Sequence, residues 1–173
     1  MKRTAVVTIL IISALIAAAQ QDKSKRPSPP GSAQFTFSDG KKITIDYSRP
    51  YMKGRKIYGG LVPYGKVWRT GANEATTFVP ERDVEVGGVK VPQGAYTLFT
   101  LPSEGTWKLI INKQTGQSGL KYDQTQDFAR IDMKKEPLSQ PVEQFTISFE
   151  PASGDSTTLR LDWENTRLSV PIK

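Results

Sequence analysis

The chain of 173 residues contains neither histidine nor cysteine. Their absence excludes catalysis by Ser-His-Asp or Cys-His arrangements, ordinary zinc sites, haem attachment through cysteine and thiol redox chemistry. No disulfide can form, and no lipid can be attached to a cysteine at a mature N-terminus. An enzyme built from the remaining residue types would depend on carboxylates, lysine, tyrosine, serine or threonine.

Motifs for nucleotides and metals are also missing. Neither a phosphate-cradling GxxxxGK[ST] pattern nor a dinucleotide-binding GxGxxG pattern occurs. Asp123, Asp127 and Asp132 lie in a turn-like region, but they lack the spacing of a calcium-binding loop and are interpreted as solvated acids. We therefore expect no cofactor and no metal site.

The N-terminal residues have the three-part pattern of a secretory signal peptide. Two basic residues precede an apolar run over residues 5–17, and the alanines at 17–19 supply small residues for cleavage. We predict a signal peptide at 1–19 and export to the periplasm or the medium. The run is short for a membrane span and no later segment is long and apolar enough, so we expect a soluble mature protein without a membrane span.

Residues 20–32 are polar and rich in proline and serine, which predicts a flexible leader before a single domain at 33–173. The formal net charge is +7, and loss of residues 1–19 would remove two cations and no acid, leaving +5. A basic exported protein favours anionic partners such as acidic glycans, anionic lipid surfaces or acidic proteins. The same charge would also serve solubility alone.

Alternating polar and apolar residues around turn signals predict two β-hairpins. Residues 34–37 and 42–47 flank Asp39-Gly40. In the same way, Gly87-Gly88 separates two short runs that alternate valine with a charged residue. Two-residue turns rich in glycine and aspartate are the strongest local hairpin signals.

Further strands are expected along the rest of the chain. Residues 95–101 and 107–112 are apolar on both faces, as in central strands. Residues 145–149 alternate, and residues 159–163 are expected to face 168–172 across a turn at Glu164-Asn165. Only 59–67 and 123–130 could hold a helical turn. The pattern predicts an all-β fold, a single antiparallel β-sandwich or barrel-like domain.

One long segment departs from the strand pattern. Residues 47–73 contain six cations and no acid, four of the six tyrosines, Trp68 and several glycines. A loop of this length in a compact domain is usually functional or disordered, and its aromatic residues argue against disorder. Rings supply stacking area, arginine supplies fork-shaped donors, and glycine allows close approach of the backbone.

This composition suits a site for an anionic or carbohydrate ligand. The candidate ligand-binding residues are Arg49, Arg55, Tyr58, Tyr64, Trp68, Arg69, Asn73 and Glu74. Alternatively, the loop wraps the edge of the sheet, with its aromatic rings at the rim of the core and its cations in solvent.

Glu74 is the first acid after this basic segment. We expect it to form an ion pair with Arg69 or Arg49, and Asn73 to bond backbone groups in a turn. In an enzyme, Glu74 would act as base with Lys66 or a tyrosine as acid. Neighbouring cations would lower the pKa of Glu74, which makes it a poor general acid.

Several stretches resemble a known family. They are YSRPYMKGRKIYGGLVPYGKVWRTGAN at 47–73, VPQGAYTLFTLP with WKLIINKQTGQ at 91–117, and PVEQFTISFE at 141–150. Over residues 32–173 the chain is similar to domain-of-unknown-function family 2911, a family of exported bacterial proteins. The resemblance implies export and a single domain, and it implies no activity.

Three classes of function remain open. The first is a non-catalytic exported module that binds an anionic or carbohydrate ligand, and we favour it. The second is a carboxylate- or lysine-dependent hydrolase or lyase in the same cleft. The third is a structural or assembly protein of the envelope that uses the loop to contact a protein partner or a second copy of itself. We expect no nucleic-acid ligand, because the cations match no reader motif.

Overall fold

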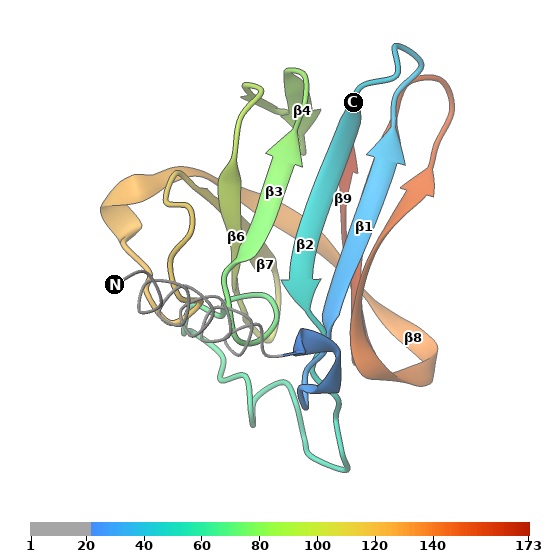
Figure 1. Ribbon diagram of the computed structural model, residues 1–173. Helices are drawn as coiled ribbons and strands as arrows, with labels where there is room; N and C mark the ends of the chain where they lie inside the picture. The colour runs from blue at the N-terminus through green and yellow to red at the C-terminus, as the bar shows by residue number, and fades with distance from the viewer. Residues whose placement is uncertain (1–21) are drawn as a thin grey trace, which may run out of the picture.

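The computed structural model describes residues 22–173, so the predicted signal peptide at 1–19 lies outside the described residues. Nine strands form one antiparallel sheet in the order β1-β2-β3-β6-β7-β8-β9-β4-β5 (Figure 1). The strands are β1 (Pro30–Thr36), β2 (Lys42–Ser48), β3 (Thr76–Pro80), β4 (Val84–Val86), β5 (Val89–Val91), β6 (Tyr96–Leu101), β7 (Trp107–Asn112), β8 (Asp127–Pro151) and β9 (Thr157–Ile172). Two short 3-10 helices, η1 (Lys23–Lys25) and η2 (Gln124–Gln126), complete the described elements.

The sheet curls because β8 is long and bent. It spans 25 residues, pairs with β7 through its first residues and with β9 through the rest. Its pairing with β9 shifts register between Pro137 and Val142 and again before Thr146. Proline cannot donate to a ladder, and such irregularities bend a strand. Figure 1 shows the result: β8 crosses behind β3 and β6 to the lower right and turns back, and β9 lies behind β1 and β2.

The curled sheet closes where the end of β2 and the loop after it meet the second half of β8. The Tyr47 hydroxyl accepts from the Ile147 amide at 2.8 Å and donates to the Ile147 carbonyl at 3.3 Å. Further along, the Phe145 amide donates to the Pro50 carbonyl at 2.9 Å. These bonds satisfy backbone groups at an edge of β8 that would otherwise lie unpaired. The prediction of an all-β fold, an antiparallel β-sandwich or barrel-like domain, is confirmed, and the strands form one sheet.

Local predictions of strands hold well. Both expected hairpins form, β1 with β2 and β4 with β5. Gly87 and Gly88 have φ of 55° and 86°, the left-handed values that a tight hairpin turn requires at both central positions. The predicted central strands are β6 and β7, each paired on both sides and almost entirely buried.

The predicted hairpin at Glu164-Asn165 is wrong. β9 continues through both residues, and Leu161 pairs with Ile147 of β8 instead of facing the end of its own strand. Glu164 adopts φ of 54°, and its carboxylate accepts the Ile57 amide at 3.3 Å. The turn-forming pair therefore marks an irregularity in a strand that binds the long loop.

One of the two expected helical turns forms, and β1 begins earlier than expected. The predicted helical turn in 123–130 is η2, whereas 59–67 contains turns and an isolated bridge between Tyr58 and Val62. β1 begins at Pro30, inside the segment that we predicted as leader. None of the helices in residues 22–173 is long and apolar enough to cross a membrane.

Candidate functional site

The long loop between β2 and β3 sends its apolar side chains into the core. Ile57, Tyr58 and Val62 are all buried. The Tyr58 ring meets Trp107 edge to face, with centroids 4.8 Å apart. The Tyr58 hydroxyl is buried without a hydrogen-bond partner in the described part of the chain, and burial raises the pKa of Tyr58. The structure therefore places this tyrosine in the core.

Trp68 also packs against other aromatic rings. It stacks on Trp163 of β9 with centroids 5.7 Å apart and an interplanar angle of 18°. Phe145 meets Trp68 edge-on at 5.0 Å. Tyr64 is half-buried against the same core, close enough to Gly59 that a Cβ there would lie 2.8 Å from the Tyr64 ring. The aromatic rings of the loop are thus largely covered by other side chains of the protein.

Beside Trp68 the loop forms a hollow that we call the basic cleft. Its volume is about 380 Å³. The side chains that define it are Arg55, Lys66, Arg69, Leu61, Trp68 and Trp163. None of the residues that line it is an aspartate or a glutamate. Three cations beside aromatic and aliphatic side chains, with no carboxylate among the lining residues, favour a positive potential in the cleft.

Arg69 is the half-buried cation of the basic cleft. Its Nε is buried and has no hydrogen-bond partner among residues 22–173. Its stem passes Gly119, where a Cβ would lie only 2.7 Å from Arg69 Cδ. A buried donor without an acceptor is costly, so such a group calls for a partner from outside the fold, a water or a ligand.

The backbone next to Arg69 is strained. Thr70 has φ of 53°, a left-handed value that is unusual for a β-branched residue. The surrounding structure holds Thr70 in place: its hydroxyl lies 3.2 Å from that of Thr100, and its carbonyl accepts from the Thr76 hydroxyl at 2.8 Å. Strain of this kind is stored at functional sites when neighbouring contacts over-determine it.

Arg55 is exposed but fixed by its own loop. Its Nε donates to the Met52 carbonyl at 2.9 Å and its Nη2 to the Tyr51 carbonyl at 2.6 Å. A guanidinium has five N–H donors, so Arg55 retains donors for a ligand while its position is set in advance. Lys66 is exposed at the rim, where its ammonium group can reach an anion as a mobile charge.

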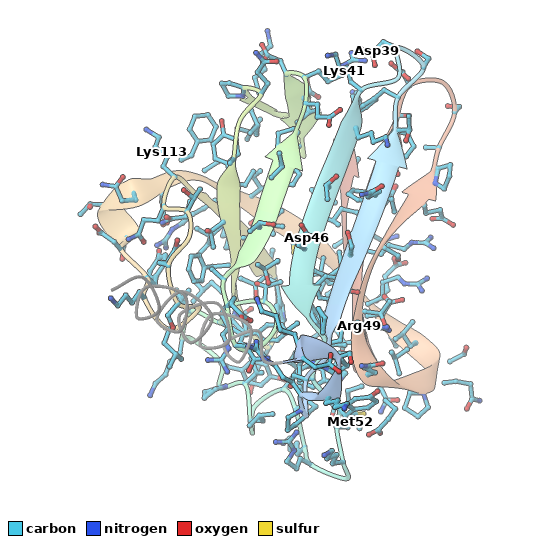
Figure 2. The ribbon with its side chains drawn as sticks, viewed as in Figure 1. Asp39, Lys41, Asp46, Arg49, Met52 and Lys113 are labelled. Carbon is cyan, nitrogen blue, oxygen red and sulfur yellow. The ribbon has the colours of Figure 1, made fainter. Side chains whose placement is uncertain are left out.

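Arg49 lies elsewhere. Its Nε donates to the Phe145 carbonyl at 3.4 Å and its Nη2 to the Thr146 hydroxyl at 3.1 Å. These contacts hold the curled sheet closed along β8, near the point where Figure 2 labels Arg49. Arg49 does not line the basic cleft.

The expected ion pair of Glu74 with Arg69 or Arg49 is wrong. Glu74 Oε1 instead accepts from Arg26 Nη1 at 2.7 Å and lies 3.3 Å from Lys23 Nζ, so two cations just outside the basic segment compete successfully for it. The hydrogen bond from Arg26 lowers the pKa of Glu74 to about 2.

Asn73 also faces the N-terminal segment. Its side-chain amide donates to the Ser28 carbonyl at 3.1 Å and to the Ser48 hydroxyl at 3.2 Å, so its partners belong to distant segments and not to the local turn that we predicted. Asn73 and Glu74 thus fasten residues 23–28 to the body of the fold. Glu74 lines a second hollow of about 470 Å³ with Lys23, Arg26 and Asp46, which we call the leader cleft.

The structure thus brings four predicted residues together and separates the others. Arg55, Lys66, Trp68 and Arg69 line the basic cleft. Glu74 and Lys66, the pair named for an enzyme, line different hollows. Within residues 22–173 no group of three or more acidic side chains is placed to hold a metal ion.

Sequence reasoning missed two contributors to the basic cleft. Trp163 reaches it from β9, almost a hundred residues after Trp68, and Ser28 reaches it from the N-terminal segment. No local pattern marks either residue, because both depend on how distant segments pack. In the sequence, Trp163 is recognisable only as an apolar position of a predicted strand.

Comparisons with known proteins give one result. The family described as "Protein of unknown function (DUF2911)" has a model that matches residues 28–172. Comparison with the curated proteins and with the solved structures gave no match. The matched range begins at Ser28 and ends at the last residue of β9, so it contains all nine strands and every side chain of the basic cleft. The resemblance seen in the sequence is confirmed, and the chain belongs to the DUF2911 family.

Proposed function

We propose that this protein is an exported, non-catalytic binding module that holds an anionic ligand in the basic cleft. Arg69 carries the proposal, because it lines the cleft and its buried Nε has no acceptor in the described residues. A carboxylate, phosphate or sulfate oxygen in the cleft would pair with the Arg69 guanidinium, and hydrogen bonds between charged partners are the strong ones. Arg55 and Lys66 add two further cations.

The charge of the cleft favours an anion over a neutral sugar. Sugar recognition by stacking needs an open aromatic face, whereas Trp68 is stacked on Trp163 and touched by Phe145. Arg69, Arg55 and Lys66 form no ion pair within the described residues. The cations are therefore the groups left to recognise a ligand.

Little supports the enzymatic alternative. Glu74, the proposed base, has its pKa lowered to about 2, mainly by the hydrogen bond from Arg26. A carboxylate with so low a pKa is a weak base at neutral pH. It also faces the leader cleft and not Lys66. Export rests on the predicted signal peptide at 1–19 and on the family resemblance.

Thermal unfolding with added anions tests the proposal. We expect inorganic pyrophosphate to raise the Tm of the full chain by about 4 °C at a tenfold excess over its Kd, because only the folded state presents the cleft. Maltotriose, a neutral glycan, should have no effect. Arg69→Met should abolish the pyrophosphate shift.

The matched control is Lys41→Met, which removes one charge from an exposed turn. Figure 2 shows Lys41 at the end of the molecule opposite Met52 and the loop. This variant should keep the full pyrophosphate shift. Equal Tm shifts in Arg69→Met and Lys41→Met would mean that pyrophosphate stabilises the protein only through its net charge, and the proposed site would be rejected.

A further inference from the structure

The basic cleft does not stand alone. A neighbouring hollow of about 360 Å³ is lined by Pro27, Ser28, Tyr51, Lys53 and Arg55, and we call it the outer hollow. The basic cleft and the outer hollow share Ser28 and Arg55. Because two residues line both, the hollows adjoin, and Arg55 stands at their junction.

The two hollows together carry four cations and no lining carboxylate. Their cations are Lys53, Arg55, Lys66 and Arg69. None of the four takes part in an ion pair within residues 22–173, whereas eleven ion pairs form elsewhere in that part of the chain. Other cations of the described residues are unpaired too, so what distinguishes this surface is that four unpaired cations gather around two adjoining hollows.

A single small anion would leave part of this charge unmatched. One phosphate or carboxylate bonded to Arg69 lies in the basic cleft, while Lys53 lines only the outer hollow. Arg55 at the junction is fixed by its bonds to the Tyr51 and Met52 carbonyls, so ordering it for a ligand costs little. Several anionic groups on one chain would use all four cations.

The leader cleft limits where a long anionic ligand can extend. The leader cleft also shares Ser28, but Asp46 and Glu74 line it, and its cations are bonded to Glu74. Because its two cations are matched by two carboxylates, the leader cleft offers no excess positive charge to a polyanion. The path for a ligand therefore runs from the basic cleft past Arg55 into the outer hollow.

Resting on the proposed function, we infer that the ligand is a linear polyanion, with anionic groups on successive units, that spans the basic cleft and the outer hollow. A chain already bound in the basic cleft can enter the outer hollow without a second loss of translational and rotational freedom. Its affinity should therefore rise with chain length until both hollows are filled. Phosphate chains and acidic glycan chains share this chemistry.

Titration calorimetry with linear phosphates of two to eight units tests the inference. We expect the affinity per chain to rise at least about tenfold from pyrophosphate to octaphosphate, beyond the gain that follows from the number of phosphates. Oligogalacturonates of the same lengths distinguish phosphate chains from acidic glycan chains. A rise of affinity with length in only one series identifies the kind of chain that the two hollows accept.

Lys53→Asn removes the cation that lines only the outer hollow. Asparagine suits the site because Lys53 has φ of 49°, which asparagine tolerates. This variant should lose most of the gain with chain length and keep its affinity for pyrophosphate, and Lys41→Asn should lose neither. Loss of the pyrophosphate affinity in Lys53→Asn would contradict the division of the surface into two hollows.

The outcomes separate the two proposals. Binding of pyrophosphate that depends on Arg69 but shows no gain with length in either series overturns the polyanion inference and leaves the anion site. Absence of binding by every anion overturns both.

Discussion

The indole rings of Trp68 and Trp163 stack 5.7 Å apart and 18° from parallel, joining the middle of the long loop to β9. This contact decides what the loop can do, because a ring that holds the loop against the sheet has less surface for a ligand. We predict that Trp68→Ala lowers the free energy of unfolding by about 3 kcal/mol in urea, since a large ring is lost from packed surroundings. Leu61→Ala, in the same cleft but 49% exposed, is the control and should cost under about 0.5 kcal/mol. A small effect for both variants would show that the loop is not held by its aromatic residues.

The Tyr47 hydroxyl makes two of the hydrogen bonds that close the sheet. Tyr47→Phe removes the group that both donates to and accepts from Ile147 and leaves those backbone groups without a partner in a buried place. We predict a loss of about 1–3 kcal/mol in the free energy of unfolding, measured in urea. Faster exchange of the Ile147 amide hydrogen should accompany it. Unchanged exchange would mean that the seam closes without this bond.

The contact between Glu74 and Arg26 predicts a dependence on pH. Because the pKa of Glu74 is about 2 in the folded protein and 4.5 ordinarily, its stabilisation is present above pH 4.5 and is lost as pH falls toward 2. The side chain is 52% exposed, so solvent limits the effect to less than about 1 kcal/mol. The difference in unfolding free energy between wild type and Glu74→Gln should therefore be small at pH 7 and vanish near pH 2. A difference that grows on acidification would contradict this account.

Arg69 should contribute little to the fold. Removing a buried donor that has no partner is neutral or favourable, while methionine keeps the apolar length of the stem. We predict that Arg69→Met unfolds in urea at the same free energy as wild type or a higher one. Arg130→Met is the contrast: Arg130 Nε donates to Asp127 at 2.8 Å, so that variant should lose stability. A loss of about 3 kcal/mol or more in Arg69→Met would show that Arg69 serves the fold.

Much of the strand pattern could be predicted from the sequence because its signals are local. Asp39-Gly40 and Gly87-Gly88 fix tight turns within a few residues, and two runs apolar on both faces can only be covered strands. The same reasoning failed at β8 and β9. The sequence pattern predicts only a short strand at 145–149 in this region, whereas β8 runs from Asp127 to Pro151 and contains Pro137 and Pro141.

The candidate site was predictable in composition but not in arrangement. The excess of cations in 47–73 is visible in the sequence, and three of them line the basic cleft. Which cation binds Glu74 could not be read, because several compete and the choice depends on where residues 23–28 dock. The division of the aromatic residues between core and cleft likewise follows from packing against β9.

The indole N–H signals in an NMR titration with pyrophosphate test the central claim, an anion site at Arg69, most directly. The protein has three tryptophans, of which Trp68 and Trp163 line the basic cleft and Trp107 is buried outside it. The account predicts that the signals of Trp68 and Trp163 move with a saturable dependence on pyrophosphate, that the Trp107 signal moves least, and that Arg69→Met removes these changes. Indole signals that stay in place while amides of residues 23–28 shift would contradict it and move the site to the leader cleft.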